Sequence, residues 1–169
     1  MQTEDRKAIA RGALIAGTVW LGLSAEILVA NVLLPSSTDD DAVSVVISYL
    51  GIFAMLFLAG MLAARDGASR TGQVLAGLVA GAMIGALTTA TFAVVDNVWL
   101  DIVAQQQPKI EGFAHSSATS MRAFINHGLI GVAVVLTAGL GLLGAALSWA
   151  GGIVGREPLS PQPIRKRPG

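Results

Sequence analysis

Four long apolar stretches limit what this chain can fold into. They run over residues 12–34, 42–64, 72–95 and 124–154, and Glu26 is the one Asp, Glu, Lys or Arg within them. An α-helix rises about 1.5 Å per residue, so each stretch is long enough to cross a hydrocarbon core of roughly 30 Å. Charged residues make up 13% of the chain, against about 25% in soluble domains. The sequence therefore predicts an all-α integral membrane protein, a four-helix transmembrane bundle.

The chain is expected to hold one domain and a tail. Residues 1–155 are predicted to form the four-span transmembrane domain, and residues 156–169 a disordered, basic cytoplasmic tail. The tail is rich in proline and has no periodic apolar residues, a composition typical of disorder. The first stretch is longer than the roughly 7–15 apolar residues of a signal peptide and contains Glu26, so we expect a retained helix.

Lysine and arginine gather on one side of the predicted bundle. The opposite side holds Lys109 and Arg122. Because cytoplasmic loops carry an excess of basic residues, both termini are predicted to be cytoplasmic. Ala, Gly and Val outnumber Ile and Lys, which favours a bacterial source and hence the bacterial inner (plasma) membrane. The residues of the basic side are Arg6, Lys7, Arg11, Arg65, Arg70, Arg156, Arg165, Lys166 and Arg167.

The segment between the third and fourth stretches, Asp96–His127, is the longest connection. Apolar residues recur at helical spacing up to Val103. The pair Gln107-Pro108 is expected to end that helix, because proline disfavours a helical residue before it. Ser116, Ser117 or Thr119 is then expected to cap a helix leading into the fourth stretch. These features predict a short extracytoplasmic helical hairpin.

Glu26 is the most informative single residue. A carboxylate inside a membrane span costs at least about 2.5 kcal/mol on insertion scales, so it should face protein or water. It shares a four-residue spacing with Thr18, Gly22 and Ala30, which suggests a small, polar face turned to the bundle interior. The other polar residues expected near its depth in the third and fourth helices are Thr88, Thr89, Thr91, Asn126 and His127.

Two readings of Glu26 stay open. In the first, Glu26 exchanges a proton or another cation and the protein is a small transporter or channel. In the second, Glu26 hydrogen-bonds neighbouring helices and has a structural role.

Rows of small residues at four-residue spacing mark two helices. Small side chains let helix backbones approach closely in a membrane. We expect these rows to pack within the chain, with a homo-oligomeric interface as the alternative. The rows are Gly77, Gly81 and Gly85 in the third helix, and Gly144, Ser148 and Gly152 in the fourth.

The sequence has no enzyme signature. There is no nucleophile elbow, zinc-protease helix, phosphate loop or dinucleotide fingerprint. Cysteine is absent, and His115 and His127 lack the helical spacing of a metal pair. The run Asp39–Asp41 lacks the spacing of a calcium loop and is expected to cap the second helix. We therefore expect no catalysis, cofactor, bound metal or nucleic acid.

The leading prediction is a small multi-pass protein of structural or accessory type. It would act in the lipid bilayer through helix packing with itself or within a larger membrane complex. The alternative is the small proton- or cation-coupled transporter or channel that uses Glu26. A cavity reaching Glu26 would favour the transporter, and a sealed Glu26 would favour the structural role.

Overall fold

The computed structural model describes residues 2–35 and 42–156, and all its regular elements are helices. The run Asp39–Asp41 and the tail beyond Arg156 lie outside the described residues. The elements in chain order are α1 (Thr3–Leu28), the π-helical η1 (Val29–Leu33), α2 (Ala42–Arg65), α3 (Arg70–Val98), α4 (Leu100–Val103), α5 (Gln107–Ala114) and α6 (Met121–Gly155).

Four of these helical segments are long and apolar enough to cross a membrane: Thr3–Leu33, Val43–Arg65, Arg70–Val98 and Met121–Gly155. The predicted all-helical architecture with four such helices is confirmed. The first segment begins nine residues before the apolar stretch that predicted it, because polar residues continue the helix there, and the other three differ from their stretches by one to three residues at each end. Ser69 caps α3 by accepting a hydrogen bond from the Gly72 N–H, and Ser120 caps α6 by accepting one from the Ala123 N–H.

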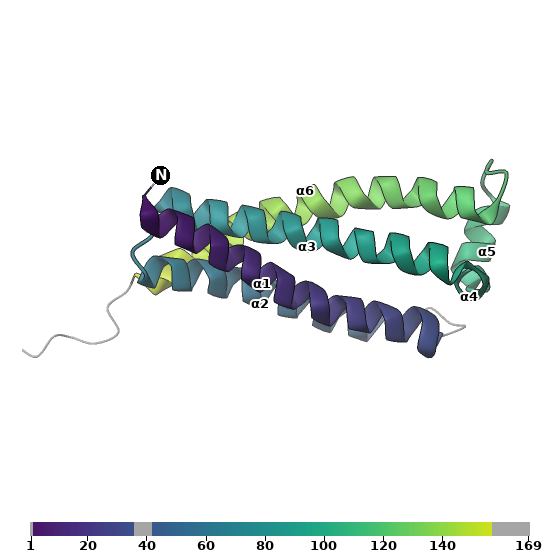
Figure 1. Cartoon of the computed structure of the whole chain (residues 1–169), viewed down its shortest axis with the longest axis horizontal. Coiled ribbons are helices and arrows are strands. Elements are labelled where there is room, and N and C mark those ends of the chain that lie inside the picture. The colour runs from purple at the N-terminus through teal and green to yellow at the C-terminus, as the bar shows by residue number, and fades with distance from the viewer. Residues whose placement is uncertain (1, 36–41, 157–169) are drawn as a thin grey trace, which may run out of the picture.

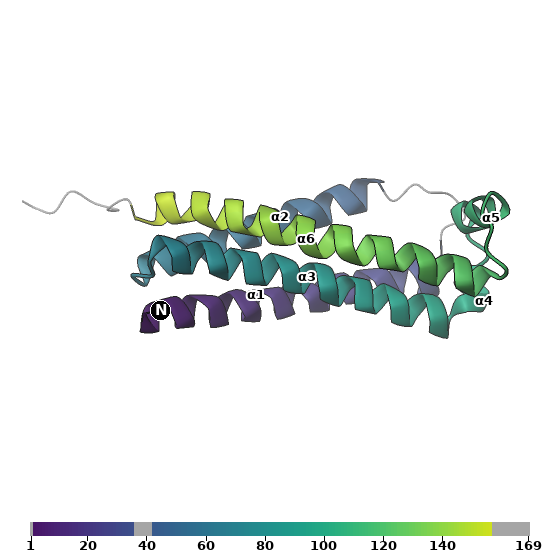
Figure 2. The same ribbon diagram turned by 90° about the horizontal axis from the view of Figure 1, so that it is seen from above.

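The long helices form an elongated bundle with α3 in contact with each of the other three (Figure 1). The start of α1, the turn between α2 and α3, and the end of α6 lie together at one end, called here the terminal end. Helices α4 and α5 lie at the opposite end, called the α5 end (Figures 1 and 2).

Glycines bring the backbones of α3 and α6 into direct contact. A Cβ atom added to Gly77 would collide with the carbonyl oxygen of Gly144, and one added to Gly81 would collide with that of Leu140. Gly85 lies against the carbonyl group of Leu136 in the same way. The two rows of small residues thus face each other within one chain, and no wider side chain fits between these backbones.

Gly152 and Ser148 extend the same contact toward the terminal end. Gly152 lies against the side chain of Gln73, and the Ser148 hydroxyl donates to the Gln73 carbonyl oxygen at 2.7 Å. Helix α2 approaches α6 here as well, where Gly60 meets the backbone of Ser148 and Gly151 meets that of Phe57. Three helices are therefore tightly packed in the terminal half of the bundle.

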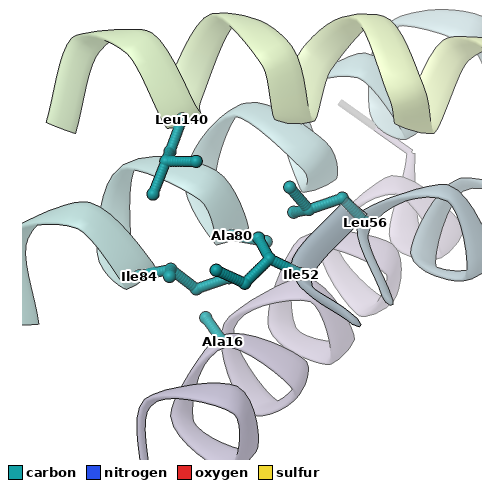
Figure 3. Packing of buried hydrophobic residues seen from close by; sticks show 6 residues of the cluster. All are labelled: Ala16, Ile52, Leu56, Ala80, Ile84 and Leu140. Carbon is teal, nitrogen blue, oxygen red and sulfur yellow. The ribbon is translucent and has the colours of Figure 1, made fainter. Parts of the chain in front are cut away.

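Apolar side chains from all four long helices fill the middle of the bundle. Figure 3 shows the cluster, in which Ala16, Leu56, Ala80 and Ile84 have no exposed surface. Burial of this kind excludes lipid and water from the helix interfaces. The cluster consists of Ala16, Ile52, Leu56, Ala80, Ile84 and Leu140.

Polar contacts tie the helices together at the terminal end. Asp5, near the start of α1, accepts a hydrogen bond from the Ser69 N–H at 2.9 Å. Arg11 forms an ion pair with Asp66 in the turn after α2. Gly67 has a φ of 82°, a left-handed conformation that favours glycine and lets the chain reverse direction within a few residues.

The segment between α3 and α6 differs in detail from the prediction. Helix α3 ends at Val98 and the short α4 follows. Pro108 lies in the first turn of α5, so the prediction that it ends a helix is wrong. Proline fits there because the first N–H groups of a helix have no intrahelical partner. The residue that caps α6 is Ser120, and Ser116, Ser117 and Thr119 do not cap it.

Candidate functional site

Glu26 lies on the face of α1 that meets α2. Its two carboxylate oxygens accept separate hydrogen bonds, from the Ser44 hydroxyl at 2.5 Å and from the Ser48 hydroxyl at 2.6 Å. The two serines are four residues apart on α2 and so project from the same face of the helix. The pair holds the carboxylate between two helices, although Glu26 is only half-buried.

A cavity of about 340 Å³ opens beside this carboxylate. All four long helices contribute to its wall, and most of the wall is apolar. The polar lining residues are Glu26, Asn31, Ser44, Ser48, Tyr49 and Thr88. The apolar ones are Leu23, Ile27, Ala30, Val45, Ile52, Ile84, Phe92, Leu136 and Leu140.

The course of α2 explains why space remains here. In both views the first half of α2 lies away from α6 (Figures 1 and 2). The close backbone contacts of α2 with α6 involve Phe57, Gly60 and Met61, all in the second half of α2. Before Ile52 this helix exposes large apolar side chains, namely Val43, Val45, Val46, Ile47 and Leu50. The cavity therefore occupies the half of the bundle nearer the α5 end.

Thr88, on α3, lines the same cavity and has an unusual hydroxyl group. Its Oγ1 atom is buried, yet it has no hydrogen-bond partner among the described residues. A threonine in a helix commonly bonds the carbonyl group four residues earlier, as Thr89 does with Gly85 at 2.9 Å. A buried polar group left unpaired costs about 1–3 kcal/mol. The Thr88 hydroxyl is therefore an unpaired polar group that lies beneath the surface of the cavity wall.

Of the polar residues predicted to lie near Glu26, Thr88 is the one that shares its cavity. Thr91 instead bonds Trp20 Nε1 at 2.9 Å and the Ser24 hydroxyl at 3.0 Å between α1 and α3. Asn126 pairs with Asn97 at 2.8 Å near the α5 end. His127 is exposed on α6, and Thr89 is buried against its own helix.

The predicted interior face around Glu26 is wrong in part. Ala30 lines the cavity, but Thr18 is exposed and Gly22 has nothing within 4 Å of the position a Cβ would take. A helix turns about 100° per residue, so a row with four-residue spacing rotates about 40° at each step. The row therefore leaves the interface within three turns.

Four polar lining residues were not predicted: Asn31, Ser44, Ser48 and Tyr49. The two serines carried a usable signal, because they are the polar residues at four-residue spacing near the start of an otherwise apolar helix. Asn31 lies in η1, and its side-chain oxygen accepts a hydrogen bond from Gln106 Nε2 at 3.1 Å. This bond connects the rim of the cavity to the turn between α4 and α5.

None of the described residues that line the cavity is a lysine, arginine or histidine. Within residues 2–35 and 42–156, no group of three or more His, Cys, Asp or Glu side chains is placed to hold a metal ion. The arrangement can therefore hold one positive charge against Glu26, with hydroxyl groups beside it and apolar walls around it.

No protein-family model matches this chain, and no curated protein or solved structure shows significant similarity to it.

Proposed function

We propose that this protein is a small proton- or cation-coupled transporter or channel of a bacterial inner membrane, with Glu26 as its cation-binding group. The observation that supports it is the cavity of about 340 Å³ that reaches this carboxylate. An ionisable residue within a membrane span is expensive and usually marks an ion or substrate pathway.

The same proposal places the chain across the membrane four times with both termini in the cytoplasm. The distribution of basic residues supports this orientation. Arg6, Lys7 and Arg11 lie in the first turns of α1, and Arg65 and Arg70 flank the turn between α2 and α3, so all five belong to the terminal end. Helices α4 and α5 then form the extracytoplasmic hairpin. The cavity lies in the half of the membrane nearer the outer surface.

In this mechanism Glu26 alternates between two sets of partners. Without a bound cation, Ser44 and Ser48 donate hydrogen bonds to the carboxylate and offset the loss of water. An incoming cation or proton neutralises the charge of the Glu26 carboxylate. Its hydrogen bonds with Ser44 and Ser48, which hold α2 against α1, then become weaker. Movement of α2 relative to α1 is then linked to binding, and no catalytic reaction or cofactor is involved.

A structural or accessory role, with a larger membrane partner or a second copy, is the second candidate. The observation that favours it is that both oxygens of Glu26 already accept hydrogen bonds from α2. In that case Glu26 joins two helices and needs no ligand.

Carbodiimide labelling in a bilayer separates the two candidates. The full chain would be reconstituted in lipid nanodiscs and treated with a membrane-permeant carbodiimide at several pH values, with the modified residue located by mass spectrometry. We expect Glu26 to react, and small organic cations to protect it. Glu26→Gln serves as the blank, and Glu111→Gln, at an exposed position on α5, should leave the label on Glu26. A Glu26 that does not react at any pH would overturn the transporter proposal in favour of the structural role.

A further inference from the structure

The cavity beside Glu26 is closed on three sides by contacts between helices. Glu26 accepts hydrogen bonds from the two serines of α2, which closes the side between α1 and α2. Thr91 accepts a hydrogen bond from Trp20 Nε1 between α1 and α3. Gly85 lies against the Leu136 carbonyl group between α3 and α6. The fourth side lies between α2 and α6, where the backbone contacts described above belong to the second half of α2.

Tyr49 marks an opening on this fourth side. It lines the cavity and precedes Gly60 by eleven residues on α2. Eleven residues are close to three full helical turns, so the two residues project in nearly the same direction. Gly60 is buried against the α6 backbone at Ser148, whereas the Tyr49 residue is 38% exposed. The face of α2 that packs on α6 in the terminal half is therefore uncovered in the other half, in agreement with the course of α2 in Figures 1 and 2.

In the membrane arrangement proposed above, this opening faces hydrocarbon. Every exposed residue of α2 from Val45 to Leu58 is apolar except Tyr49, and so is every exposed residue of α6 from Gly128 to Leu143. Tyr49 lies seven residues after the first residue of α2, a rise of about 10 Å along the helix. A molecule dissolved in the lipid can therefore reach Glu26 from the side of the bundle.

The wall of the cavity selects its ligand by charge and by apolar surface. Glu26 supplies the one carboxylate of the described wall, and no described lining residue is a lysine, arginine or histidine. Both carboxylate oxygens already accept hydrogen bonds, so the ligand needs a positive charge but no N–H donor. Attraction between opposite charges is stronger in apolar surroundings than in water.

The size of the cavity favours an organic ion over a metal ion. Its volume of about 340 Å³ falls at the lower end of the roughly 300–1,000 Å³ of sites that hold small organic molecules. Hard cations such as calcium take about six to eight oxygen ligands, which a mostly apolar wall does not supply.

We propose that the cavity takes up a lipophilic organic monocation directly from the bilayer, through the side between α2 and α6. The positive charge of the ligand pairs with Glu26, and its apolar body covers Ile84 and Leu140 in the cavity wall. This inference rests on the function proposed above and specifies the class of ligand and its route of entry.

Competition binding on the unaltered chain in nanodiscs tests the class of ligand. The bound probe is radiolabelled trimethyl(4-phenylbutyl)ammonium. Its competitors are the neutral isostere in which carbon replaces the nitrogen, (5,5-dimethylhexyl)benzene, and the anion 4-phenylbutanesulfonate, each adjusted to the same mole fraction in the lipid. We expect saturable binding of the cation, and competition by the isostere that is at least about tenfold weaker than that of the unlabelled cation, because the isostere lacks the charge. The sulfonate should not compete.

A nitroxide spin label at a single cysteine tests the route, since the chain has no cysteine of its own. Tyr49→Cys carries the label at the opening. Leu50→Cys is the matched control, because Leu50 is the next residue of α2, is 62% exposed and lies outside the cavity wall. We expect oxygen, which concentrates in hydrocarbon, to relax both labels, and a water-soluble nickel chelate to relax neither. The cation should reduce oxygen access to the label at position 49 and leave it unchanged at position 50.

The outcomes separate this inference from the proposed function. Equal competition by the neutral isostere would overturn the requirement for charge, since the cavity would then accept any apolar molecule, including a lipid acyl chain. Access of the nickel chelate to the label at position 49 but not at position 50 would overturn entry from the bilayer and leave Glu26 as a cation-binding group reached from water. Absence of saturable cation binding, or oxygen access at position 49 that the cation does not change, would overturn the inference as a whole. A Glu26 that fails to react with carbodiimide would overturn the proposed function itself.

Discussion

Asp5, in the first turn of α1, carries a carboxylate that accepts hydrogen bonds from two backbone N–H groups. The Ser69 N–H donates at 2.9 Å from the start of α3, and the Gln2 N–H donates at 3.1 Å from its own helix. Asp5 precedes the apolar stretch that begins at Gly12. The hydrogen bonds from Ser69 favour the charged form and lower the pKa of the Asp5 carboxyl below its ordinary value of 3.8.

A lowered pKa makes the contribution of Asp5 to stability depend on pH in a fixed direction. The contribution is fully present above the unfolded pKa and is lost as the pH falls through the lower, folded pKa. Asp5→Asn should therefore reduce the thermal midpoint of the chain in detergent at pH 7, and the difference from the unaltered chain should shrink as the pH drops below about 4. Thermal unfolding at pH 7, 5 and 3.5 measures this.

Glu4→Gln is the control for this experiment. Glu4 is the neighbouring acid, and its ion pair with Lys7 lies within one turn at the surface. Exposed ion pairs of this kind contribute little to stability. The thermal midpoint of Glu4→Gln should therefore stay close to that of the unaltered chain at every pH. A deficit in Asp5→Asn that does not change with pH would contradict the ionic account.

The sequence identified Glu26 as a candidate site residue, but it identified only some of the residues around it. A single acidic residue in an apolar helix can be recognised from the sequence alone, because placing its charge inside a membrane costs much free energy. Its partners depend on how α1 and α2 are rotated toward each other, which helix composition does not determine. Ser44 and Ser48 were therefore missed, and Thr91 and Asn126, at a similar predicted depth, bond other partners.

Between elements, the contact of α3 with α6 depends on the absence of side chains. Gly81→Leu would place a large side chain where the Leu140 carbonyl oxygen lies. Overpacking typically costs about 1–3 kcal/mol, and a collision with backbone falls at the upper end of that range. We expect a markedly lower thermal midpoint and aggregation on size-exclusion chromatography in detergent.

Gly139→Leu, on α6, is the matched control for Gly81→Leu. No atom of the described residues lies within 4 Å of the position its Cβ would take, so this variant should remain monodisperse with a thermal midpoint near that of the unaltered chain. Equal damage from both variants would show that loss of glycine, rather than the α3–α6 contact, is responsible.

Helix α5 is attached to α3 by an ion pair between Lys109 and Asp96 at 3.2 Å. The Asp96 side chain is only 3% exposed, so removing its partner leaves a buried charge. Lys109→Gln should loosen α5 at a cost of about 1–3 kcal/mol, which would appear as faster cleavage between α3 and α6 by chymotrypsin. Lys7→Gln, at an exposed pair, should not change the cleavage rate.

At the element scale the long helices were predictable and the short ones were not. Uniformly apolar stretches of more than twenty residues leave no alternative to helices. The prediction for Pro108 was wrong because proline occurs both at the end of a helix and in its first turn. The neighbouring residues do not distinguish these two positions. The cap of α6 was placed too early for a similar reason, since Ser116, Ser117, Thr119 and Ser120 are all competent N-cap residues.

For the whole molecule, the proposed orientation makes a direct prediction. A fluorescent protein that matures only in the cytoplasm should fluoresce when fused after Gly169. The same protein inserted between Ser116 and Ser117, in the exposed turn after α5, should stay dark. A secreted phosphatase at the same two sites should give the opposite pattern. Phosphatase activity at the C-terminus would contradict the four-crossing arrangement.

The uneven distribution of backbone contacts along the bundle has a consequence for how such a protein can evolve. Gly60, Gly77, Gly81 and Gly151 admit no larger residue, whereas Gly22, Gly51, Gly128 and Gly131 have open space around them. A saturation mutagenesis library selected for folding should therefore be depleted of variants at the first set and rich in variants at the second. Residues around the cavity can then change and alter ligand preference, while the glycine contacts keep the chain folded.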